Sequence, residues 1–358
     1  MTMTTGTHDI TFLLAQNQVA GREYGFDRIV EVLTADLQAH NERVADELTW
    51  LAEPVTVGIG RNGSSVQGTM EEVDDHARGT TSREQPGSNV GFPLRKYRFA
   101  LGWTRDFEDQ ATPADYATGV VGAQRADIRR LSYLLKLAVY TPTNSTFYDR
   151  YVLPGQIQLN LPVRALYNAD SEPIPDSPWG EVFNAATHTH YDANATLTTT
   201  ALDASITNLT EHGYSNDVKI IINKNDRAGF EALTGFVRAV PANIIPGNQA
   251  DVAVQRMDSQ RTDNRMIGVY DEYEVWVKPW AIQNYAIITD VGSMEKPFAY
   301  RQHALSNRMG LFIEADDDNF PYRSQYMTHY MGFGAYNRGN MVVLKFDNAS
   351  YSAPTITE

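Results

Sequence analysis

The clearest pattern of apolar and polar positions lies between Thr112 and Pro142, where apolar side chains recur every three or four residues. Thr112 can cap a first turn, Pro113 suits the first helical position, and Asp115 can accept hydrogen bonds from the free amides. We therefore predict a helix over residues 112–140, about 28 residues and roughly 40 Å long. Its apolar positions are Tyr116, Val120, Ile128, Leu131, Leu135 and Val139.

A second helical pattern occupies residues 22–51, and His40 marks a place where this helix could break. The apolar stripe consists of Phe26, Ile29, Val30, Leu33, Leu37, Val44 and Leu48. Such a stripe has to be covered, either by the same chain or by a neighbouring molecule.

Two strand-like runs flank about twenty polar residues in the segment 54–104. The polar stretch is rich in Gly, Ser and charged residues, which predicts a long hairpin that we call the extended loop. It contains too few apolar residues to form a core of its own. An ordinary surface hairpin is the alternative interpretation.

The middle of the chain alternates between helical and strand patterns, which is typical of a mixed α/β domain. A helix is predicted over residues 198–213, followed by the buried strand 218–222 and a short helix from position 225. Residues 238–268 are polar and rich in turn formers, so we expect an exposed loop there. Two strands, separated at Pro279, are expected in residues 269–290.

The C-terminal part contains three consecutive aspartates, Asp316, Asp317 and Asp318, between two strand patterns. Asp favours turns, and Pro321 cannot occupy a central strand, so these residues are interpreted as a hairpin turn. A calcium loop is the alternative, but the acidic residues do not alternate as such a loop requires.

The charge and composition of the chain exclude several classes of function. The chain has 44 acidic and 30 basic residues, with a net charge of −14, which argues against a nucleic-acid-reading protein. It has no cysteine, so disulfides, thiolate metal sites and thiol nucleophiles are excluded. The sequence contains neither a signal-peptide pattern nor a run long enough to span a bilayer, so no membrane partner is expected.

Candidate catalytic residues are few. In the stretch HTHYD, His188, His190 and Asp192 could form part of a metal site, and a metallohydrolase is the corresponding alternative function. The stretch GIGRNG lacks the Lys-Ser/Thr pair of a phosphate loop, and no nucleophile elbow occurs. We therefore expect no enzyme activity and no cofactor.

The order of these elements and the amino-acid sequences of several C-terminal segments resemble those of a known family. The segments are YDEYEVWVKPWAIQNYAIITD, KPFAYRQ, GLFIEADDDNFPYRSQYMTHYMGFGAYNRGNMVVLKF and SYSAPTI. They are similar to the C-terminal parts of the major capsid proteins of tailed viruses, which have the Hong Kong 97-type (HK97-like) fold. The resemblance covers essentially the whole chain.

The resemblance implies an α+β capsid fold with the following division. Residues 1–53 would form an N-terminal arm, 54–104 the extended loop (E-loop), 105–145 a peripheral domain with its spine helix at 112–140, 146–300 an α/β axial domain, and 301–358 the remaining peripheral strands and C-terminus.

The resemblance also implies a function. The protein would self-assemble as hexamers and pentamers into the icosahedral head of a tailed bacteriophage or archaeal virus, and would enclose dsDNA without reading its sequence. Scaffolding, portal and decoration proteins would be its partners, and assembly would take place in the host cytoplasm. The inter-subunit contact residues implied are Arg61, Arg78, Arg83, Arg95, Lys96, Arg98 and Trp103.

One departure from the family matters. Its best-known member cross-links subunits through a Lys of the extended loop, whereas residues 54–95 contain no Lys and the first is Lys96. We therefore expect no covalent cross-link. An encapsulin, a cellular compartment of the same fold, remains the alternative shell.

Overall fold

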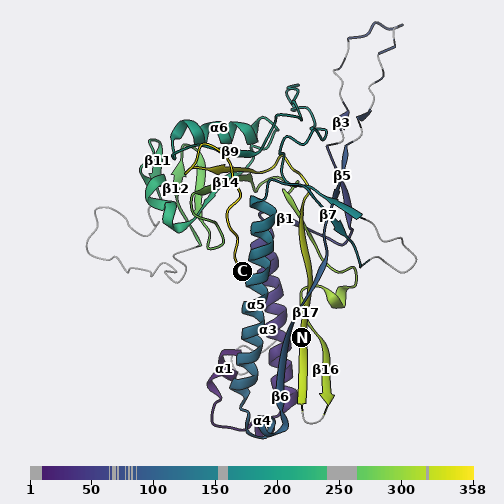
Figure 1. The fold of residues 1–358 in the computed structure, drawn as a ribbon, viewed down its shortest axis with the longest axis vertical. Coiled ribbons are helices and arrows are strands. Elements are labelled where there is room, and N and C mark those ends of the chain that lie inside the picture. The colour runs from purple at the N-terminus through teal and green to yellow at the C-terminus, as the bar shows by residue number, and fades with distance from the viewer. Residues whose placement is uncertain are drawn as a thin grey trace.

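The structure is a computed structural model that describes residues 10–151 (except 64, 67–69, 71, 77, 80, 82–83 and 86), 160–239, 264–319 and 322–358. Figure 1 shows a long stalk of helices and strands, a head set to one side of its upper end, and a hairpin that projects beyond both. No helix in the described part of the chain is both long and apolar enough to span a bilayer.

The stalk is built around α5 (Pro113–Tyr140), and its bounds confirm the predicted helix. The backbone amide of Thr112 donates to the carboxylate of Asp115 at 2.8 Å, as expected at a capped first turn. Most of the predicted apolar positions face the core, but Ile128 is 48% exposed.

Helix α3 (Phe26–Leu48) runs beside α5 along the stalk (Figure 1). It does not break at His40. That side chain is buried, and its Nε2 atom lies 3.0 Å from the carboxylate of Asp127 on α5, so His40 joins the two helices. Val30, expected in the apolar stripe, is 57% exposed. Three shorter helices complete this part of the molecule: α1 (Ile10–Ala15), α2 (Gly21–Tyr24) and α4 (Arg105–Gln110).

A five-stranded sheet, counted over the described residues, lies against these helices and is organised by one long strand. Strand β17 pairs with three others, which come from distant parts of the sequence. The strands are β1 (Ala52–Val55), β6 (Arg95–Thr104), β15 (Phe298–Arg301), β16 (Leu311–Asn319) and β17 (Tyr322–Ala335). The main apolar core fills the space between this sheet, the two long helices and the head.

The three aspartates are in a strand, so the predicted turn at 316–318 is wrong. They lie in β16, where Asp316, Asp317 and Asp318 stand opposite Gln325, Ser324 and Arg323 of β17. A long partner strand offers the aspartates of β16 a backbone ladder, and this outweighs the weak turn preference of Asp.

The head is a mixed sheet of seven strands among the described residues, with α6 (Thr199–Thr210) packed on it. In spatial order the strands are β11 (Phe236–Arg238), β12 (Arg265–Tyr270), β13 (Tyr273–Val277), β10 (Val218–Ile222), β14 (Tyr285–Asp290), β18 (Val342–Lys345) and β9 (Tyr191–Ala193). The predicted helix at 198–213 and the buried strand 218–222 are confirmed.

The segment 269–290 holds parts of three strands, whereas two were predicted. The first run is itself a hairpin, β12 to β13, that turns at Asp271, whose φ is +49°. Asp tolerates this left-handed conformation better than most residues, which makes such a tight turn feasible. Most of the exposed loop predicted at 238–268 lies outside the described residues.

The remaining elements are short. They are β2 (Ile59–Asn62), β3 (Ser65–Val66), β4 (Glu84–Gln85), β5 (Ser88–Gly91), β7 (Ser145–Tyr148), β8 (Asn160–Val163), the 3-10 turns η1 (Lys224–Asp226) and η2 (Ser306–Arg308), and α7 (Arg227–Glu231).

Candidate assembly surfaces and a histidine cluster

The extended loop is firmly attached at its base. Its strands β2 and β5 pair in antiparallel register, and the amide of Phe92 donates to the carbonyl of Gly58 at 2.8 Å. The buried Arg301 of β15 donates from Nη1 to the carbonyl of Phe92, also at 2.8 Å, and forms an ion pair of 2.7 Å with the buried Asp149. A charge pair removed from water costs much to break, so the base of the loop is fixed to the five-stranded sheet.

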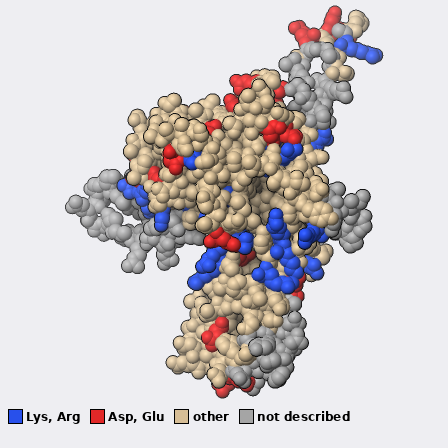
Figure 2. Space-filling model, in the orientation of Figure 1, with Lys and Arg blue, Asp and Glu red and all other residues tan. Residues whose placement is uncertain are grey.

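The outer part of the loop is different. Among its described residues, the apolar side chains of Met70 (105%) and Val73 (49%) are exposed, and nearer the base Val57 (58%) and Ile59 (37%) are exposed as well. Figure 2 shows acidic and basic side chains together at its tip. Exposed apolar side chains on a projecting hairpin are typical of a contact surface for another molecule.

The contact residues implied by the sequence have different surroundings. Arg61 and Arg78 are exposed on the extended loop. Arg83 lies outside the described residues. Trp103 belongs to β6, where the register places it opposite Arg323 of β17.

Strand β6 also carries Arg95, Lys96 and Arg98. Figure 2 shows basic side chains gathering where the head meets the stalk. Lys96 and Arg98 both donate to the carboxylate of Glu314 on β16. The hydrogen bond from Lys96, followed by that from Arg98, holds the pKa of Glu314 at about 2. Two of these cations are thus already paired within the chain, whereas Arg95 packs over the ring of Phe147.

Of the predicted metal ligands His188, His190 and Asp192, the structure brings only the two histidines together. The Nε2 atom of His188 lies 3.1 Å from Nε2 of His190 and 2.8 Å from Nε2 of His212. His190 is fully buried, and its Nδ1 atom lies 2.8 Å from the carbonyl oxygen of Met341. We call His188, His190 and His212 the histidine cluster.

Asp192 does not join this cluster. Its carboxylate accepts hydrogen bonds from Ser205 at 2.7 Å and from Asn208 at 3.2 Å, both on α6. The third histidine, His212, follows the end of α6 and was missed by sequence reasoning. Its spacing from the HTHYD stretch carries no signal, because only the packing of α6 on the sheet brings it close.

Burial sets the charge of the cluster. It lowers the pKa of His188 and lowers that of His212 to about 3. It also holds the pKa of His190 well below its usual value. The neighbouring histidines lower the pKa of His190 further. The rings of Tyr167 and Phe183 pack against the cluster and keep water from much of it. All three imidazoles are therefore neutral at pH 7.

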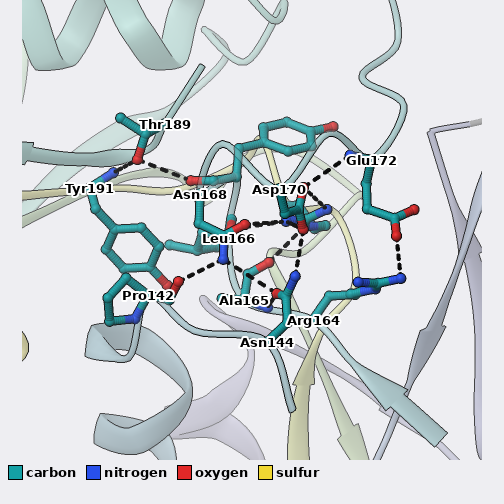
Figure 3. A network of polar contacts seen from close by, with 12 residues as sticks. Pro142, Asn144, Arg164, Ala165, Leu166, Asn168, Asp170, Glu172, Thr189 and Tyr191 are labelled. Atoms are coloured by element: carbon teal, nitrogen blue, oxygen red, sulfur yellow. Dashed lines mark hydrogen bonds and ion pairs between the residues drawn. The ribbon is translucent and has the colours of Figure 1, made fainter. Parts of the chain in front are cut away.

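A polar network links the end of α5 to the head, as Figure 3 shows. Asn168 donates to the carbonyl of Pro142 at 2.6 Å, and Asn144 donates to Asp170, also at 2.6 Å. The fully buried Arg338 donates to Asp170 at 2.7 Å and to the carbonyl of Ala165 at 2.6 Å. This network fixes the stalk helix relative to the loop that leads into the head.

Comparison with solved structures identifies the fold. No protein-family profile and no curated protein matches the chain. A solved structure from Mycobacterium phage Patience is similar over 99% of this chain and 96% of that chain, with 19% identity and a TM-score of 0.67.

Two further structures are similar at 12% identity. They are the capsid of a native GTA particle (84% of this chain, 90% of that chain, TM-score 0.44) and the holo-SrpI encapsulin complex from Synechococcus elongatus PCC 7942 (86% and 89%, TM-score 0.45). The similarity to the Mycobacterium phage structure extends over nearly the whole of both chains, so it includes both the stalk and the head. The chain is an α+β protein with the Hong Kong 97-type fold of phage capsids.

Proposed function

We propose that this chain is the major capsid protein of a tailed virus, and that it assembles as hexamers and pentamers into an icosahedral head around dsDNA. The observation that carries the proposal is the extended loop, which is fixed at its base and exposes apolar side chains beyond it. In the part of the chain that the structure describes these side chains join no apolar core, whereas a neighbouring subunit in a shell would cover them.

The division of the chain follows from this function. Residues 1–53 serve as the N-terminal arm, 54–104 as the extended loop, 105–145 and 301–358 as the peripheral domain, and 146–300 as the axial domain. In this scheme the stalk corresponds mainly to the peripheral domain and the head mainly to the axial domain, although α3 of the arm packs along the stalk and β18 belongs to the head sheet. The stalk, with α3, supplies stiffness, while the extended loop reaches neighbours, so that many modest contacts add up to a stable particle.

The charge of the chain suits a container for DNA. A net charge of −14 disfavours binding of phosphate, so the wall would not retain the genome during packaging or release. Scaffolding, portal and decoration proteins are the expected partners, and the host cytoplasm is the expected place of assembly. The role is structural and not enzymatic.

Electron microscopy of the expressed protein tests the proposal directly, since icosahedral particles are expected. Deletion of residues 70–89 should leave the circular dichroism spectrum of a folded subunit and abolish or alter the particles. Normal particles from the deletion variant would refute the role of the extended loop.

A matched pair of substitutions sharpens the test. Met70 on the extended loop and Met294 on the head are both almost fully exposed, at 105% and 93%. Met70→Asp should reduce particle yield, because a charge would be buried between subunits, whereas Met294→Asp should assemble normally. Equal yields from the two variants would show that the loop surface has no special role.

A further inference from the structure

The histidine cluster brings three ring nitrogens so close together that hydrogen bonds among them cannot satisfy all of them. A carbonyl oxygen can only accept, so Nδ1 of His190 carries a proton and donates it to Met341 at 2.8 Å. With its proton on Nδ1, the ring of His190 can offer a lone pair from Nε2. It points to Nε2 of His188, which is 3.1 Å away.

His188 faces two nitrogens at once. Its Nε2 atom lies within 3.1 Å of His190 and 2.8 Å of His212, but a ring nitrogen holds only one proton or one lone pair in its plane. A proton on Nε2 of His188 can be donated to one of these two neighbours, so the other short nitrogen–nitrogen contact is left without a good hydrogen bond. A cation placed among the three nitrogens would accept a lone pair from each.

We propose that His188, His190 and His212 bind a divalent transition-metal ion of the zinc type. Three imidazole nitrogens suit zinc, whereas magnesium and calcium require oxygen ligands. Zinc lies 2.0–2.1 Å from each nitrogen, which places tetrahedral ligand atoms about 3.3 Å apart. The three nitrogens here all lie within 4.8 Å of one another, so small side-chain shifts complete the geometry.

The surroundings of the cluster fit a metal ion. The bond from His190 to the carbonyl of Met341 fixes the ring and its tautomer, as outer partners of metal-binding histidines do. Nδ1 of His188 lies 3.8 Å from the carboxylate of Glu211, which would offset part of the charge of the ion. The nearby guanidinium of Arg338 is paired with Asp170 at 2.7 Å, which reduces its repulsion.

The ligands come from two separate segments, and one side of the site is open. His188 and His190 precede β9, while His212 follows α6, so an ion would tie this loop to the helix. His188 and Glu211 line an open hollow that gives the ion a way in and leaves a fourth position for water. The proposal does not depend on assembly of a shell.

Zinc binding by the full-length chain, prepared without a polyhistidine tag and stripped with a chelator, tests the proposal. Elemental mass spectrometry after gel filtration should find about one zinc per chain, and zinc but not magnesium should raise the melting temperature. Cobalt(II) should bind at the same site and give the strong visible absorption of a tetrahedral complex. This spectrum requires no variant, so it tests the site even if substitutions impair folding.

Substitution of single histidines tests whether the ion binds at the histidine cluster. His188→Gln and His212→Gln should each lower zinc affinity by at least about tenfold, the lower end of what loss of even an outer partner of a metal ligand costs. His76→Gln is the matched control, since His76 is exposed on the extended loop and should leave affinity unchanged. Zinc no tighter than magnesium in the wild type, or equal zinc affinity in all three variants, would overturn the proposal.

Discussion

At the scale of single residues, a buried carboxylate holds together the helices and the sheet of the stalk. Asp127 on α5 accepts from His40 on α3 at 3.0 Å and from His329 on β17 at 2.6 Å, and His329 in turn contacts the hydroxyl of Tyr300 at 2.8 Å. Burial alone would raise the pKa of Asp127, but the hydrogen bonds from the two histidines outweigh it and lower this pKa to about 2.

Asp127→Asn should reduce the free energy of unfolding by about 2 kcal/mol at pH 7, because one histidine loses its acceptor. The folded-state pKa of about 2 is below the usual 3.8, so the carboxylate stabilises the fold fully above pH 3.8 and loses this effect as the pH falls through 2. The difference between wild type and variant, measured by urea unfolding, should therefore stay constant above about pH 4 and shrink as the pH falls from there to 2.

The exposed Asp46 on α3 provides a control for this experiment. Asp46→Asn should change stability by less than about 0.5 kcal/mol at any of these pH values. A difference for Asp127→Asn that stays constant down to pH 2 would contradict the role assigned to its carboxylate.

Only part of this residue-scale detail could be predicted from the sequence. The Thr112 and Asp115 cap lies within four consecutive residues, so the sequence displays it directly. The partners of Asp127 lie 87 and 202 positions away, and no local pattern connects them. His212 was missed for the same reason.

At the scale of elements, β17 determines how closely the extended loop approaches the stalk. A Cβ atom on Gly332 would lie 2.0 Å from the carbonyl oxygen of Pro93, and one on Gly334 would lie 2.5 Å from that of Gly91. The two glycines are two residues apart and so share one face of the strand. That face is where the base of the loop crosses.

Gly332→Ala should destabilise the fold by more than 2 kcal/mol, because a backbone carbonyl cannot move away as a side chain can. Gly122→Ala in α5 is the matched control, since a Cβ there meets nothing within 4 Å. It should stabilise the helix by about 0.5–1 kcal/mol. Melting temperatures that shift in the same direction for both variants would contradict this account.

Elements with a strong local pattern were predictable, and those fixed by pairing were less so. α5, α6 and β10 follow from periodicity and caps within their own residues. The strand that carries Asp316, Asp317 and Asp318 was mistaken for a turn, because the sequence does not show that β17 extends far enough to pair with it.

At the scale of the whole molecule, the absence of Lys from residues 54–95 limits how a shell can be held together. Subunits should remain linked by non-covalent contacts alone, so denaturing gels of mature particles should show one band near 40.0 kDa. A ladder of multimers that survives boiling in detergent would contradict this prediction and would point to a cross-link outside the extended loop.

The position of the last strands has a consequence for synthesis of the protein. β17 completes the stalk sheet and β18 lies between β14 and β9 in the head, so the stalk sheet cannot close before translation has passed Ala335, nor the head sheet before Lys345. In the nascent chain β1 has to wait for its partner β15, and β6 for its partner β17. A prematurely terminated chain would lack an interior strand, so we expect such fragments to be degraded or to aggregate rather than enter a particle.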